Sequence, residues 1–184
     1  MTVVSSRFPE DFPTLETDRT TLQELTVEHA EGVFRNFSDA EMMRYLMTPI
    51  TSIEQATQFV EAFAEEFKDG AGLTWAIVEK STGVFLGTLS YVVDADGNGD
   101  IGFDIWKDYW GQGLMIEALQ AVLDWGFNEL GGQRTEAHTL VGNTRAIRVL
   151  EHAGFQVNQV RQDNTVVHGE PEDEIFFTIR SPNP

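Results

Sequence analysis

The sequence predicts a single α/β (α+β) domain in which helices flank a central sheet. Three observations support this fold class. Segments between residues 26 and 69 repeat their apolar side chains at the helical period, whereas residues from 73 onward change to the two-residue period of strands. Near residue 112 a strand passes into an amphipathic helix through two glycines. The chain has 184 residues, 41% of them hydrophobic, and shows no repeat or interdomain linker, so one core is expected.

The N-terminal part is predicted to contain an arm, one strand and three helices. Residues 1–14 include two prolines and no periodicity, which indicates a loose arm. Residues 15–25 are predicted to form a strand, and Thr26 can cap a helix that ends near residue 37. Ser38 or Asp39 can cap a second helix carrying Met42, Met43, Tyr45 and Leu46.

A third helix and a hairpin follow. Ser52 and Gln55 form a capping box that opens the helix, and glycines at 70 and 72 end it. Residues 73–79 and 84–93 alternate as two strands. The next loop, 94–99, is acidic and glycine-rich, but it lacks the full ligand series and the closing glutamate of a calcium loop. A plain turn is therefore expected there, and no metal site is predicted.

The C-terminal half continues with strands and two helices. A strand over 100–105 leads into a helix over about 112–130, and residues 135–141 form the next strand. Asn143 can cap a further helix that begins beside it, and Gly154 can end that helix. The last strands are expected over 155–160 and 175–179, joined by an acidic loop over 162–173.

The stretch Tyr-Trp-Gly-Gln-Gly-Leu-Met, residues 109–115, is the one around which the chain is organised. A helix N-terminus exposes unpaired N–H groups and the positive end of its dipole, and glycine lets a ligand approach the backbone. The stretch can therefore hold a phosphate. A Walker loop is excluded because no Gly-Lys-Ser/Thr run exists, and a dinucleotide fingerprint lacks its third glycine. A plain strand–turn–helix corner is the alternative for this stretch alone.

Two motifs resemble those of the GNAT N-acetyltransferase superfamily. Residues 110–115 resemble its pyrophosphate loop, Gln/Arg-x-x-Gly-x-Gly/Ala, and most closely the Trp-Gly-Gln-Gly form of the RimJ/RimL-type branch, although Trp110 and Met115 depart from the general pattern. Residues 143–155 resemble the second signature, Asn-x-x-Ser/Ala, a helix and Gly-Phe. The resemblance covers almost the whole chain. It implies the GNAT acyl-CoA N-acyltransferase fold, with a mixed, mostly antiparallel sheet whose fourth and fifth strands splay apart.

The resemblance also implies that acetyl-CoA is the cosubstrate and lies between the splayed strands. Amides of the glycine loop would hold the pyrophosphate, and backbone groups at the end of the preceding strand would pair with the pantetheine arm and polarise the thioester carbonyl. Arg145, Arg148 and Lys107 are candidates to neutralise the polyanion. The resemblance implies that the residues that bind acetyl-CoA are Ile105, Trp106, Gly111, Gln112, Gly113, Leu114, Met115, Ile116, Asn143 and Arg148.

Direct acetyl transfer requires an amine that has lost its proton, so a general base is sought near the cleft. Asp104 on the fourth strand, and Glu136 and His138 on the fifth, are the candidates, although each can equally be a solvated surface group. Many GNAT enzymes carry a tyrosine in the second-motif helix that protonates the leaving thiolate. Leu150 occupies that position here, so this acid is missing.

Composition narrows the partners and the compartment. The chain has no cysteine, which excludes disulfides and a covalent acetyl-cysteine route. Its net charge of −18 makes nucleic acid a poor partner. The acidic surface could attract a cationic acceptor, and salt adaptation explains it as well. Neither a membrane-spanning run nor a signal peptide is recognised, so a cytoplasmic protein is expected.

We therefore predict an acetyl-CoA-dependent N-acetyltransferase that acts on a primary amine, either a protein N-terminus or a small amine. The acceptor pocket is expected from the early helices and the acidic loop at 162–173. A non-catalytic acetyl-CoA-binding sensor or subunit is the alternative. A homodimer is expected at the level of the family only.

Overall fold

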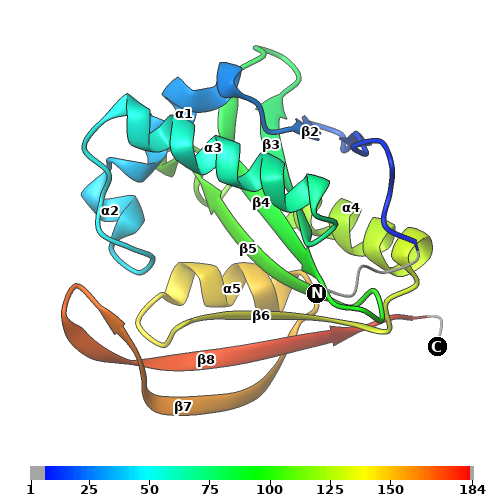
Figure 1. Cartoon of the computed structure of the whole chain (residues 1–184). Helices are drawn as coiled ribbons and strands as arrows, with labels where there is room; N and C mark the ends of the chain where they lie inside the picture. The colour runs from blue at the N-terminus through cyan, green and yellow to red at the C-terminus, as the bar shows by residue number, and fades with distance from the viewer. Residues whose placement is uncertain (1–6, 183–184) are drawn as a thin grey trace.

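The computed structural model describes residues 7–182, which form one eight-stranded sheet with helices on both faces (Figure 1). The strands are β1 (Leu15–Glu16), β2 (Thr20–Glu24), β3 (Gly72–Glu79), β4 (Phe85–Val93), β5 (Gly99–Ile105), β6 (Arg134–Leu140), β7 (Gln156–Val167) and β8 (Glu170–Arg180). Their order in the sheet is β1-β2-β3-β4-β5-β6-β8-β7. The β5–β6 pair is parallel and the other neighbouring pairs are antiparallel, which confirms the predicted mixed, mostly antiparallel sheet.

Five α-helices of the described residues cover the sheet. They are α1 (Ala30–Phe37), α2 (Ala40–Met43), α3 (Ile53–Lys68), α4 (Leu114–Trp125) and α5 (Thr144–His152). The first three pack around a small apolar cluster on one face, and α4 and α5 share a larger cluster with β2–β6 and β8 on the other. The larger cluster contains the fully buried Trp75, Tyr91 and Phe177, and burial of each such side chain contributes roughly 1.5–3 kcal/mol. No helix in residues 7–182 is both long and apolar enough to cross a membrane.

β5 and β6 separate along their length. They pair only where Gly99–Ile101 faces Thr135–Ala137. Beyond these residues β5 stays with β4 as far as Ile105, whereas β6 stays with β8 as far as Leu140. The predicted splay of these two strands is therefore confirmed, and it opens a gap in the middle of the sheet.

The structure corrects the N-terminal elements. The strand predicted over 15–25 is divided into β1 and β2, because the Thr17 hydroxyl accepts from the Thr20 amide at 2.9 Å and turns the chain. Part of the predicted loose arm, residues 1–6, lies outside the described residues. In the described part Phe8 and Phe12 pack on Phe67, so this segment is fixed to the larger core.

The second helix is also shorter than predicted. α2 ends at Met43, so Tyr45 and Leu46 follow it instead of lying within it. Asp39 is its cap, because its carboxylate accepts from the amides of Glu41 and Met42. This short helix leaves the segment over 44–46 free to line a pocket, as described below.

The signature helix begins later than predicted and ends irregularly. Its N-cap is Gly113, in a left-handed conformation at φ +79°, so α4 starts at Leu114. From Gly126 to Leu130 the helix widens into a π turn. Gly126 lies against Tyr91, whose hydroxyl would be 2.6 Å from a Cβ at this position, so only glycine fits the close approach.

The segment over 162–173 was predicted as a loop, and that prediction is wrong. It is the outer part of the long β7–β8 hairpin, whose turn contains His168 and Gly169. Pairing continues from Thr165 to Val167 beyond an irregularity after Arg161. β7 is an exposed edge strand, so its side chains need not alternate between apolar and polar.

Candidate functional site

The glycine loop joins the end of β5 to the start of α4. After Ile105 the chain makes a short turn, and the Trp110 indole N–H donates back to the Ile105 carbonyl at 2.8 Å. Gly111 and Gly113 both have positive φ, +73° and +79°, which L side chains adopt rarely. The amides of Gln112, Gly113, Leu114 and Met115 donate to no group in the part of the chain that the structure describes. Four unpaired donors at a helix N-terminus form an anion site.

Arg19, from the turn between β1 and β2, fixes the far side of this loop. Its guanidinium donates to the Gln112 carbonyl at 2.8 Å and to the Glu117 carboxylate at 2.5 Å and 2.8 Å. Glu117 lies in the first turn of α4. The loop carbonyl is thereby turned toward Arg19, which leaves the loop amides for a ligand.

Replacement of Arg19 with methionine is therefore expected to raise the KM for acetyl-CoA roughly tenfold with little change in kcat, because charge-assisted hydrogen bonds that shape the loop are lost. Steady-state kinetics with varied acetyl-CoA measures this. Arg134→Met, which removes a comparable surface ion pair with Glu136, is the matched control. An unchanged KM in the Arg19 variant would contradict the role of Arg19 in shaping the loop.

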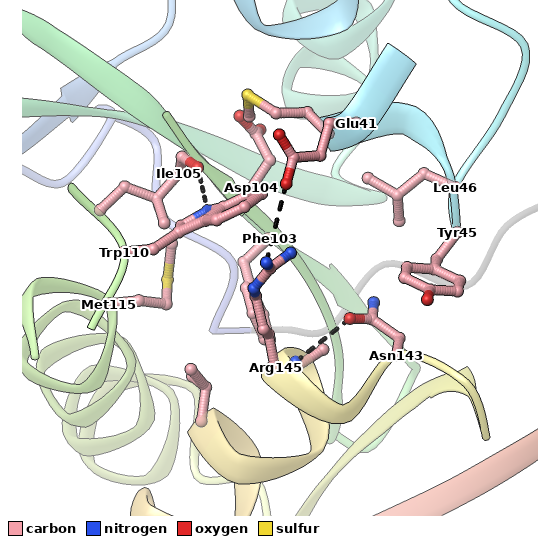
Figure 2. Close-up of a pocket in the computed structure, with 13 residues that line it drawn as sticks. Glu41, Tyr45, Leu46, Phe103, Asp104, Ile105, Trp110, Met115, Asn143 and Arg145 are labelled. Atoms are coloured by element: carbon pink, nitrogen blue, oxygen red, sulfur yellow. Dashed lines mark hydrogen bonds and ion pairs between the residues drawn. The ribbon is translucent and has the colours of Figure 1, made fainter. Parts of the chain in front are cut away.

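Two hollows adjoin the loop within the described chain. The first, called here the outer groove, has a volume of about 690 Å³ and runs from the glycine loop along α5 to Arg148 and His152. The second, called the inner pocket, has a volume of about 100 Å³ and lies between the C-terminal end of β5 and the start of α5 (Figure 2). Ile105, Trp110, Met115, Arg145 and Val149 line both. The two hollows therefore adjoin each other.

Figure 2 shows Arg145 in the middle of the inner pocket, with Trp110 and Met115 on one side and Tyr45 and Leu46 on the other. The Arg145 guanidinium lies 4.1 Å from the centre of the Trp110 ring and 3.7 Å from the Glu41 carboxylate. A cation over an aromatic face is attracted by the ring quadrupole. This stack joins the loop to α5 across the gap in the sheet.

Most of the residues predicted to bind acetyl-CoA lie together at these hollows. The outer groove is lined by Ile105, Gly111, Gly113, Leu114, Met115, Ile116 and Arg148. Asn143 lines the inner pocket. Asn143 caps α5 by accepting from the Ala146 amide and donates to the Thr139 hydroxyl at 3.1 Å. Its predicted role as a helix cap is confirmed.

Two of these residues lie differently from the rest. Gln112 lines neither hollow, because its side chain donates to the Asp108 carbonyl. Trp106 also lies outside both hollows. Its amide donates to the Leu86 carbonyl at 2.7 Å, and its ring is covered by Arg35 at 4.7 Å. The Trp106 N–H is therefore already engaged, and the groove presents the loop amides instead.

Asp104 lies at the wall of the inner pocket in a buried network. It is 8% exposed, and its carboxylate accepts from the Thr88 amide, the Thr88 hydroxyl and the Asn36 amide group at 2.8 Å. Burial raises the pKa of Asp104, whereas the bonds from Thr88 and Asn36 and the nearby Arg35 charge act in the lowering direction. A buried carboxylate with a raised pKa at a pocket is suited to exchange a proton.

The other two candidates for the general base lie apart from the hollows. Glu136 and His138 project from the exposed face of β6, and their side chains are each 49% exposed. Glu136 pairs with Arg134, and His138 stacks on Phe176 and lies 3.9 Å from Asp100. Neither residue lines the inner pocket or the outer groove. Leu150 is 1% exposed in the larger core and does not line them either.

The sequence analysis missed several residues that the fold brings to the site. Glu41 and Tyr45, at and after α2, line the inner pocket opposite the loop. Arg19 contacts the loop from 93 residues away in the chain. A Thr-Asp-Arg turn gives no local sign of such a contact. These positions depend on how distant elements pack.

A splayed sheet, a loop of unpaired amides and a continuous groove together define an acyl-CoA-dependent acyltransferase. A family model described as "Acetyltransferase (GNAT) domain" matches residues 19–156. The chain therefore belongs to the GNAT acetyltransferase family, and it is an acetyl-CoA-dependent acyltransferase.

Similar proteins share the acetyltransferase family with this chain, and similar solved structures share its fold. The chain is 32% identical to "Uncharacterized N-acetyltransferase YoaA" of Bacillus subtilis (strain 168) over 174 residues, which covers 93% of this chain and 98% of that protein. It is 30% identical to "Uncharacterized N-acetyltransferase p20" of Bacillus licheniformis, covering 90% and 95%. RimL, a ribosomal alpha-N-protein acetyltransferase solved with coenzyme A, shares its fold with a TM-score of 0.84 at 16% identity, over 91% of this chain and 98% of that chain. The self immunity acetyltransferase MccE, solved with acetyl-CoA and AMP, gives 0.82 at 18% identity, over 90% and 94%.

Proposed function

We propose that this protein transfers the acetyl group of acetyl-CoA to the nitrogen of a primary amine, as a member of the RimJ/RimL-type branch. The observation that carries the proposal is the set of unpaired amides at Gly113, Leu114 and Met115, residues that line a groove adjoining a pocket at the end of β5. Such donors bind a pyrophosphate, and the groove leads from them to the inner pocket. The Trp-Gly-Gln-Gly sequence of the loop and the fold shared with RimL support membership of the RimJ/RimL-type branch.

In this proposal the loop residues and Arg148 hold the polyanionic end of the cosubstrate. The unpaired amides of Gly113, Leu114 and Met115, residues that line the groove, would donate to the pyrophosphate, and Arg148 adds positive charge at the far end of the groove. The bound cosubstrate supplies an acetyl thioester to the inner pocket. Asn143 and Ile105 border that pocket, where they can orient the pantetheine arm.

Asp104 is proposed as the general base. The amine nitrogen forms a bond to the acetyl carbon, the carbon–sulfur bond breaks so that CoA leaves as its thiolate, and the amine proton passes to the Asp104 carboxylate. Thr88 and Asn36 fix the carboxylate, and burial of Asp104 keeps its pKa above the ordinary range, which favours proton uptake. Glu136 and His138 are not used, because they lie on another part of the sheet.

The alternative is a sensor or subunit that binds acetyl-CoA without transferring acetyl. This alternative is supported by Leu150, which occupies the position of the tyrosine that acts as acid in many members of the family. The lining of the inner pocket by an ionisable carboxylate favours the enzyme.

Titration of the protein with acetyl-CoA by calorimetry, followed by measurement of free-thiol release with a panel of primary amines, tests the proposal. Saturable binding and amine-dependent thiol release are expected. Binding without thiol release from any amine would favour the sensor, and absence of binding would overturn both readings.

A further inference from the structure

A third hollow lies on the α2 side of the inner pocket and has a volume of about 300 Å³. It is called here the arginine hollow, because Arg44, Arg145 and Arg148 line it. It shares Glu41, Tyr45 and Asn143 with the inner pocket. The two hollows are therefore neighbours across the segment that follows α2.

The charge of the arginine hollow is opposite to that of the whole protein. The chain has 12 basic residues against 30 acidic ones, yet three arginines and a single carboxylate, Glu41, line this hollow. Arg44 and Arg148 form no ion pair with a carboxylate anywhere in residues 7–182. Arg19, Lys80 and Arg134, which lie outside this hollow, are each paired with a carboxylate. The unpaired guanidinium groups are thus available to an external anion.

The position of the hollow indicates which substrate would bring that anion. No residue of the glycine loop lines it, and it meets the outer groove at Arg145 and Arg148. Arg148 borders both the outer groove and this hollow, whereas Arg44 borders only the hollow. A group that rests on Arg44 therefore enters from the α2 side, where the acceptor must approach the inner pocket.

We propose that the amine acceptor carries an anionic group, a carboxylate or a phosphate, a few bonds from its nitrogen, and that Arg44 binds this group, with the positive charges of Arg145 and Arg148 beside it. The proposal rests on the acetyltransferase function proposed above. The ammonium end of the acceptor faces the carboxylates of Glu41 and Asp104 in the inner pocket, and its anionic end faces the arginines. The acidity of the whole chain therefore does not select a purely cationic acceptor.

Binding to the protein saturated with CoA tests this without any need for turnover. Calorimetry compares matched amines, namely phosphoethanolamine with ethanolamine, and glycine and serine with glycinamide and serinamide. Wild-type protein is expected to bind the anionic member of at least one pair roughly tenfold more tightly, with the difference reduced by added salt. Arg44→Gln is expected to remove the difference. Arg134→Gln, with the same change in net charge, is expected to keep it.

Equal binding of the anionic and neutral members in every pair would overturn the inference. The anion could instead be a phosphate of the cosubstrate. In that case Arg44→Gln would weaken binding of acetyl-CoA but not of 3′-dephospho-acetyl-CoA, and this result would also overturn it. Thiol release is measured separately with the same amines, so a protein that binds anionic amines but acetylates none would refute the proposed function and leave the arginine hollow as an anion site.

Discussion

The Gly113→Glu variant is expected to lose acetyl-CoA binding, with a dissociation constant raised at least about 100-fold. Gly113 is the N-cap of α4, and its amide is one of the four unpaired donors of the loop. A glutamate there places a negative charge beside the phosphates and a side chain at φ +79°, a conformation that costs an L residue about 1–2 kcal/mol. Calorimetric titration with acetyl-CoA measures the loss.

Gly83→Glu is the matched control for this experiment. Gly83 also has positive φ, +72°, and no atom lies within 4 Å of the position of an added Cβ. The control therefore carries the same charge and the same backbone strain, but it lies in the β3–β4 turn, away from both hollows. Retained binding is expected in Gly83→Glu. Equal affinity in the two variants would refute the assignment of the loop to the pyrophosphate.

The Asp104→Asn variant is expected to lose about 100-fold or more in kcat while its KM for acetyl-CoA changes little, because an amide cannot accept the amine proton. Its free energy of unfolding should fall by about 1–3 kcal/mol, since an amide NH2 then faces either the Thr88 donors or the Asn36 donor in place of an accepting oxygen. Thiol-release kinetics and urea unfolding measure the two effects separately. Glu136→Gln, at a carboxylate that lines neither the inner pocket nor the outer groove, is the control and should keep most of kcat.

The pH dependence provides an independent test of Asp104. The base must be ionised to act, so kcat/KM should fall as the pH drops below its raised pKa, and this limb should be absent in Asp104→Asn. The Thr88 hydroxyl lowers the pKa of Asp104, so Thr88→Val should move the limb to higher pH. A limb that is unchanged in both variants would contradict the role of Asp104 as base.

The free energy of unfolding should also depend on pH through the ionisation of Asp104. Because the folded-state pKa of Asp104 is raised, its contribution to stability is fully present below the unfolded pKa and is lost as the pH rises through the folded pKa. The wild type should therefore gain stability relative to Asp104→Asn as the pH falls from 7 into the ordinary carboxyl range. Urea unfolding at a series of pH values measures this difference.

Several features of the site followed from local sequence. The glycines at 111 and 113 take left-handed conformations that few other residues adopt, so their spacing indicates the loop shape. Asn143 caps α5 through a bond that spans three residues. The two-residue period of the middle strands predicted the sheet. The junction between the strand that ends at Ile105 and the following helix predicted where the groove lies.

Other features were set by tertiary structure. The sequence did not distinguish Asp104 from Glu136 and His138 as the base, because the burial of Asp104 depends on Asn36, 68 residues away, and on Thr88 of the neighbouring strand. Arg19 reaches Glu117 across 98 residues. The hairpin over 162–173 has no apolar alternation, since its outer strand is an exposed edge, and its pairing with β8 decides its form.

The sequence by itself determined the fold family, the glycine loop at the start of α4 and the asparagine cap of α5, because these depend on backbone geometry encoded by residues close together in the chain. Only the tertiary structure decided which carboxylate is buried at the pocket and which arginines gather without partners beside it. Burial, pKa and ion pairing depend on what other elements of the fold place around a side chain, and net composition averages over such local differences.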